Sequence, residues 1–118
     1  MSLKVPAPPE AQPGSIRVYG AQLPAERAEH IRRRLRDAEP SLLTEYEHYL
    51  EEFPGVEGRV QLRLGINRDG KVADIVRVYS EVNDEFGGRL RPILEVIEFG
   101  AGPDAYAYYT LEFRPDPL

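Results

Sequence analysis

The sequence contains no cysteine, only two histidines and no long apolar run. The absence of cysteine excludes disulfides, thiol nucleophiles and Cys-ligated zinc sites. A membrane-spanning helix needs roughly 20 predominantly apolar residues, and no stretch approaches that length. The first residues do not form the pattern of a signal peptide. These absences exclude several kinds of site but do not identify a compartment.

Residue types that carry chemistry do not converge in any recognisable pattern. His30 and His48 lie among charged neighbours without the spacing of a metal site. The carboxylates from Glu45 to Glu52 are typical of the wet side of an amphipathic helix. No phosphate-binding loop or nucleophile elbow is present. We therefore expect no catalytic residue, no metal, no cofactor and no enzymatic activity.

The charge balance argues against nucleic-acid binding. The formal net charge is -5, whereas a nucleic-acid interface needs a basic surface to neutralise phosphates. The single basic cluster, Arg32 to Arg36, is flanked by acids such as Glu29 and Asp37. Such a cluster is typical of a solvated helix face.

The length of 118 residues fits one domain. Residues 1–15 contain four of the prolines and predict an extended spacer. The opening Met1-Ser2-Leu3 looks like a start codon placed before an internal fragment, with targeting signals and an anchor further upstream. Residues 16–118 form the expected domain.

The first half of that domain predicts a short strand and a long helical region. Residues 15–20 alternate polar and apolar, which favours a short strand at a sheet edge. Apolar residues then recur at helical spacing from Ile31 to Phe53. Pro40 lies within this stripe, so we expect a kink or break near Glu39, and two helices or one bent helix both fit. Pro54-Gly55 should end the element.

The second half predicts a hairpin, a helix and a final strand. Residues 59–66 and 71–80 form two strands joined by a turn at 67–70. Asn83 or Asp84 can cap the next helix, which we expect to be short and centred on 92–98. The last strand covers 105–114. We infer an α+β fold with a three-stranded sheet, in which the second and last strands run parallel and flank the first, and both helices pack on one face.

One tyrosine-rich segment is the best candidate for a binding site. Residues 106–109 place three tyrosines on what we expect to be an edge strand. An open edge offers unpaired backbone groups that can capture an extended peptide. The candidate partner-binding residues share the outward alternation of this strand: Tyr106, Tyr108, Thr110 and Glu112. The alternative is that Tyr109 packs inside and the other tyrosines merely cover the edge.

Three runs of residues, 58–62 (GRVQL), 66–72 (INRDGKV) and 78–80 (VYS), resemble the C-terminal domain of TonB. In that family a Gly-x-Val strand, an Asp-Gly turn and a strand ending in Ser precede a helix and a final strand. Residues 86–102 also fit the family's helix and its exit, with Phe99 in the aromatic position.

The resemblance is closer to the AgmX/PglI type of this domain, which belongs to gliding motility. There a short strand ending in Gly precedes a long helix with a Cys-Tyr-Glu motif and then Pro-x-x-x-Gly-x-Val. The corresponding residues here are 18–20 (VYG), 45–47 (EYE) and 54–60 (PGVEGRV). Glu45 replaces the first Cys of that type, and the second Cys, near Leu90, is also missing.

The resemblance implies a non-catalytic periplasmic domain at the end of an inner-membrane-anchored, envelope-spanning protein. Such a domain would bind a segment of an outer-membrane or envelope protein and would pass on force or a signal, as in energy-coupled transport or gliding. The alternatives are a self-associating assembly module, for instance a homodimer, and a small enzyme.

Overall fold

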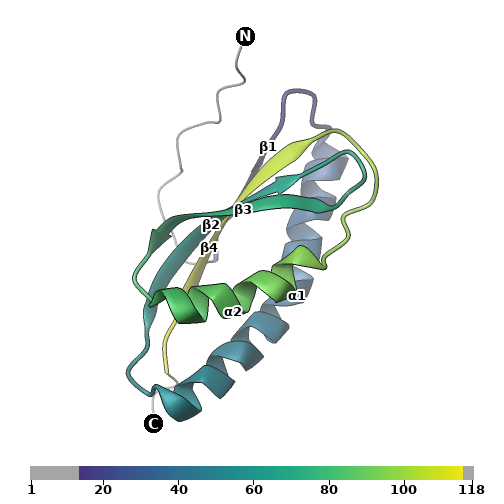
Figure 1. Cartoon of the computed structure of the whole chain (residues 1–118). Coiled ribbons are helices and arrows are strands. Elements are labelled where there is room, and N and C mark those ends of the chain that lie inside the picture. The colour runs from purple at the N-terminus through teal and green to yellow at the C-terminus, as the bar shows by residue number, and fades with distance from the viewer. Residues whose placement is uncertain (1–13, 116–118) are drawn as a thin grey trace.

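The computed structural model describes residues 14–115 and shows an α+β fold, with two helices and a four-stranded antiparallel sheet over that range (Figure 1). The elements, in chain order, are β1 (Ile16–Tyr19), α1 (Ala25–Glu52), β2 (Gly58–Ile66), β3 (Val72–Ser80), α2 (Asp84–Glu95) and β4 (Ala105–Phe113). The strand order in the sheet is β1-β4-β2-β3. Most of the expected spacer, residues 1–13, lies outside the described residues.

The hairpin formed by β2 and β3 is confirmed. Gly70 takes φ +82° in the connecting turn, and its N–H donates to the Asn67 carbonyl. The Asn67 side chain accepts from the N–H groups of Asp69 and Lys71, which closes the turn locally. β4 pairs antiparallel with the other side of β2, so β3 and β4 run parallel and flank it as predicted.

The prediction of a three-stranded sheet is wrong, because β1 joins the sheet as a fourth strand. It pairs antiparallel with β4, from Ile16 opposite Tyr109 to Tyr19 opposite Tyr106. The 28-residue α1 carries the chain back across the sheet between β1 and β2. The predicted short edge strand is present as residues 16–19, but alternation alone did not indicate its partner.

Of the two alternatives left open at Pro40, the structure has one helix, since α1 continues through Pro40 without a break. Proline removes one helical hydrogen bond and crowds the preceding turn. The apolar stripe compensates, because Leu35 and Leu42 are fully buried on either side of it. The Thr44 hydroxyl also donates to the Pro40 carbonyl at 2.9 Å, one turn further along the helix.

The second helix is longer than predicted and begins earlier. Asn83 caps it, as one of the two expected alternatives, by accepting from the Phe86 N–H at 2.9 Å. Fully buried Phe86 anchors this first turn despite the two glycines that follow. The helix ends at Glu95 rather than Glu98, so the expectation of a helix centred on 92–98 is wrong.

Both helices cover the same face of the sheet, as predicted. That face presents the apolar residues of β2 and the alternating core residues of β4. Rings from both helices and from β4 meet there: Phe86 lies 5.5 Å from Tyr46 and 4.9 Å from Phe113 between centroids. Burial of these apolar side chains, at roughly 25 cal/mol per Å² removed from water, stabilises the two-layer arrangement.

The turn of the hairpin is fastened to the loop that precedes β4. The Phe99 N–H donates to the Gly70 carbonyl at 2.8 Å, and the Gly102 N–H donates to the Arg68 carbonyl at 3.0 Å. Arg27, in the first turn of α1, donates to the Phe99 carbonyl at 2.9 Å. The turn that leads into β3 is therefore held by the loop before β4, and Arg27 of α1 holds that loop.

Candidate functional site

The four predicted binding residues lie on one face of the sheet, the face away from the two helices. Pairing with β2 sets their alternation, because Tyr108 stands opposite Arg63 and Thr110 opposite Gln61. Tyr106 and Glu112 are partly buried, whereas Tyr108 and Thr110 are fully buried. The structure thus brings the four residues onto one face, in a row along β4.

The expectation that β4 is an open edge strand is wrong. β1 pairs with its first half, and the pairing extends further because the Gly14 N–H donates to the Thr110 carbonyl at 2.9 Å. The Thr110 N–H in turn donates to the Ser15 carbonyl at 3.0 Å. The backbone groups that strand addition would need are therefore already used between Tyr106 and Thr110.

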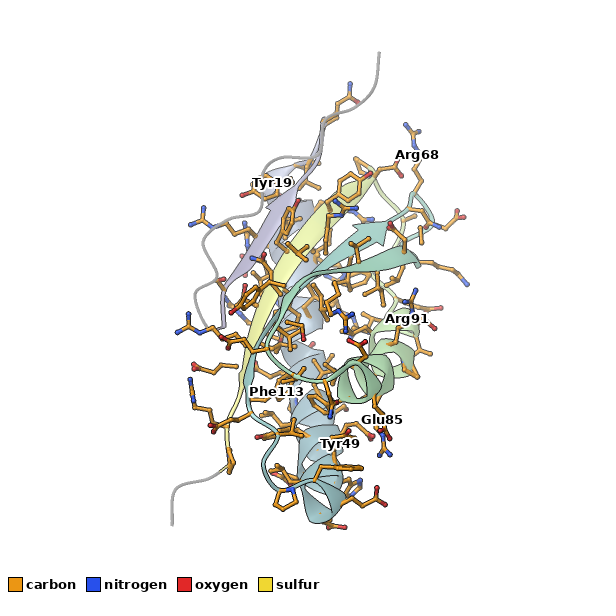
Figure 2. The ribbon with its side chains drawn as sticks, turned by 60° about the vertical axis from the view of Figure 1, so that its left-hand side comes forward. Tyr19, Tyr49, Arg68, Glu85, Arg91 and Phe113 are labelled. Atoms are coloured by element: carbon orange, nitrogen blue, oxygen red, sulfur yellow. The ribbon has the colours of Figure 1, made fainter. Side chains whose placement is uncertain are left out.

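The side chains of the same row contact their neighbours in the sheet. The Arg63 guanidinium lies 5.5 Å from the Tyr106 ring centroid. Tyr19 and Tyr108 meet edge to face, with centroids 5.9 Å apart. Figure 2 shows Tyr19 on β1, at the side of the sheet opposite α2. These contacts are what cross-strand neighbours make within a sheet.

The open edge of the sheet that lies beside α2 is β3. It is nine residues long and ends the strand order, so no described strand pairs with its outer side. Most of its side chains are exposed, including Tyr79 and Val76. Its register with β2 shifts near both ends, which is a common feature of edge strands.

The far end of β3 carries a tyrosine–carboxylate contact. The Tyr79 hydroxyl donates to Glu81 at 2.7 Å, and Glu81 also accepts from the Arg59 N–H at 2.7 Å. The hydrogen bond from Tyr79 is the main cause that lowers the pKa of Glu81, and the same bond raises the pKa of Tyr79. Both side chains are exposed.

An open groove of about 310 Å³ lies between β3 and α2. Its apolar lining comes from three elements and consists of Leu62, Ile75 and Leu94. Arg77, Asp84 and Arg91 add charges, and Gly87-Gly88 forms a part of the α2 wall without side chains. Figure 2 labels Arg91 on α2, one of the residues that line the groove.

This groove was not predicted from the sequence. Two adjacent glycines in a helix that is otherwise amphipathic were the available signal, because glycine often marks a place where another group approaches closely.

Tyr109, which the sequence analysis considered as an internal residue, packs under the helices. It is 1% exposed, and among the described residues its hydroxyl has no hydrogen-bond partner. Burial raises the pKa of the Tyr109 phenol above its usual value, with a smaller contribution from Glu39. This residue belongs to the core and not to a binding surface.

The two histidines are exposed and lie apart on α1, at His30 and His48. Within residues 14–115, no three His, Asp or Glu side chains come together as potential metal ligands. Neither of the helices described there is long and apolar enough to cross a membrane.

The geometry therefore identifies two adjoining features, the outer edge of β3 and the groove between β3 and α2, as the candidate site. Comparison of the chain with protein-family models, curated proteins and solved structures found no match to any of them.

Proposed function

We propose that this chain is a protein-binding domain that captures an extended segment of a partner by strand addition to β3. The observation that carries the proposal is the open outer edge of this nine-residue strand. An edge strand presents a row of N–H and C=O groups that an incoming strand can pair with. The sequence predicted the same mode of binding on β4, but β4 is already paired with β1, so β3 at the opposite edge is the strand that can receive a partner.

The length of β3 favours it over β1 as the receiving edge. β1 has four residues and β3 has nine, so β3 offers more than twice the length for backbone pairing. The groove beside β3 supplies side-chain contacts that a flat edge lacks. In strand addition the backbone pairing gives affinity, while pockets for alternate side chains give specificity.

We further propose that the domain works in the periplasm as the terminal part of a TonB-like, envelope-spanning protein. The support is the resemblance of its motifs, together with the element order, in which a short strand and a long helix precede the hairpin, helix and final strand. The partner would be a segment of an outer-membrane or envelope protein.

Hydrogen exchange tests the binding mode. Selection of a random heptapeptide library on the folded domain would supply a synthetic peptide as the probe. We expect the outward-facing amides of β3 to exchange quickly in the free domain and slowly with the peptide bound, while the amides of β1 stay unchanged. Protection of β1 alone, or of neither edge, would contradict strand addition to β3.

The gene tests the cellular setting. We expect the full open reading frame to encode one hydrophobic segment of roughly 20 residues and a proline-rich spacer upstream of residue 16. A reading frame that begins at Met1 would contradict the envelope setting, but it would leave the binding mode intact.

A second candidate function, self-association, is favoured by the same open edge. Two copies can pair through β3 about a two-fold axis, since such an interface is self-complementary. Sedimentation over a concentration series separates the two functions. A species that stays monomeric while it binds the selected peptide would exclude the assembly module.

A further inference from the structure

We propose that the groove between β3 and α2 binds two side chains of the bound segment, one apolar and one acidic, at positions i and i+2 of that segment. This inference rests on strand addition to β3 and specifies the partner of that site. Its basis is the position of the groove: Ile75 and Arg77 of β3 line it together with residues of α2.

Strand geometry fixes the spacing of the two side chains. Ile75 and Leu64 are paired across the β2–β3 ladder, and Leu64 is buried under the helices, so Ile75 faces the helical side of the sheet. A segment added beyond β3 would place every second side chain on that same side, about 7 Å apart. These side chains would enter the space between β3 and α2.

The floor of the groove is apolar and therefore favours an apolar side chain of the partner. Leu62, Ile75 and Leu94 line it, and the volume of about 310 Å³ lies near the lower end of binding pockets, which run from roughly 300 to 1,000 Å³. An aliphatic or aromatic side chain placed there would remove apolar surface from water. A wholly polar segment would gain nothing from this floor.

The bare wall formed by Gly87-Gly88 gives the incoming side chain its room. A Cβ atom added at Gly88 would meet nothing within 4 Å, and one added at Gly87 would make only an ordinary contact with Arg77. Packing within the domain therefore does not require glycine at Gly88. Glycine is unfavourable in a helix interior, so the empty space beside it is consistent with occupation by a partner.

The charges at the groove favour an acidic second side chain. Two cations, Arg77 and Arg91, line it against one anion, Asp84, in a chain whose net charge is -5. Arg77 pairs with Asp84, and Arg91 pairs with Glu95 at 2.9 Å. All of these groups are exposed. A carboxylate of the partner can therefore accept two hydrogen bonds from the guanidinium of Arg77 or Arg91.

The test uses the library-selected heptapeptides as probes. We expect the enriched sequences to share an aliphatic or aromatic residue and, two positions away, Asp or Glu. Gly88→Leu fills the groove and should weaken binding of the best peptide at least about tenfold, with an unchanged or higher Tm. Gly55→Leu is the matched control, since a Cβ there also meets nothing within 4 Å and Gly55 lies outside the groove.

A charge reversal keeps the test decisive if the first variant folds poorly. Arg91→Glu should shift the selected residue from acidic to basic at the same position. Unchanged peptide affinity in Gly88→Leu, or the same acidic preference in Arg91→Glu, would overturn the groove proposal. If β3 amides are still protected in that case, strand addition stands and only the groove fails; if no peptide protects β3, the proposed function itself fails.

Discussion

β3 and β4 have the same length and both pair with β2, yet their surroundings differ strongly. Seven of the nine residues of β4 are buried, whereas every residue of β3 is partly or fully exposed. β4 has β1 on its outer side and the rings of both helices over its inner face. Among the strands of residues 14–115, β3 has a neighbour on one side only.

This difference indicates that β4 belongs to the core of the domain, whereas β3 is the strand that is available to a partner. Tyrosines on β4 resemble a binding surface in the sequence, but their strand is enclosed within the sheet. β3 contains fewer aromatic residues, and no described strand pairs with its outer edge. Availability for strand addition thus depends on position in the sheet more than on residue type.

The largest contrast in stability is expected between Phe113 and Val76. Phe113 is fully buried against Tyr46 and Phe86, so Phe113→Ala should lower the free energy of unfolding by about 3–5 kcal/mol. Val76→Thr, on the exposed strand, should change it by less than about 0.5 kcal/mol. Urea unfolding measures both, and similar losses in the two variants would contradict the contrast.

The next largest effect concerns the end of β3 that is held in place. Gly70 has φ +82°, and a Cβ there would collide with the backbone of Gly100. Gly70→Ala should therefore cost about 2–3 kcal/mol. Gly88→Ala is the control, because it enters open space in a helix and should stabilise the domain by up to about 1 kcal/mol. Thermal unfolding should move the two variants in opposite directions, and equal shifts would refute this interpretation.

A smaller effect is expected where α2 begins, just after β3. Asn83 caps this helix and also accepts from the Tyr49 hydroxyl at 3.2 Å. Asn83→Ala should lower the free energy of unfolding by about 1–2 kcal/mol. Asn83→Asp keeps both acceptors and should retain most of the stability, so denaturant titration of the pair separates the cap from a general loss at this site.

The smallest effect concerns the core side of β4. Tyr109→Phe removes a buried hydroxyl that has no partner among the described residues, so it should stabilise the domain by about 1 kcal/mol. The pKa of Tyr109 in the folded domain is raised above its ordinary value of 10.0. The part of the folding free energy that depends on the protonated phenol is therefore fully present below pH 10 and is lost as the pH rises further. Urea titrations between pH 8 and 11 should show a shallower alkaline decline in Tyr109→Phe, and an unchanged decline would argue against this assignment.

Local patterns predicted the elements well where one signal dominated. The alternation of residues 59–66 and the Asn67–Gly70 turn predicted the hairpin, and the apolar stripe from Ile31 to Phe53 predicted the long helix. Errors and open alternatives arose where distant contacts decide. Burial on both sides of Pro40 selects one continuous helix over two, and Asn83 with Phe86 starts α2 earlier than predicted despite Gly87-Gly88.

The candidate site was the least predictable part. Whether a strand lies at an edge depends on every other strand, and the pairing of Ile16 with Tyr109 leaves no trace in the local sequence. The groove likewise combines residues from β2, β3 and α2. The mode of binding proposed from sequence is kept, while its location moves from Tyr106–Glu112 to β3.

Intermolecular nuclear Overhauser effects in the complex of the domain with a library-selected heptapeptide test the central claim most directly. We expect regular cross-strand contacts between the peptide backbone and residues 72–80 of β3, with an apolar peptide side chain near Ile75. Contacts of the peptide with β1, or with the tyrosine row of β4 and none with β3, would contradict it.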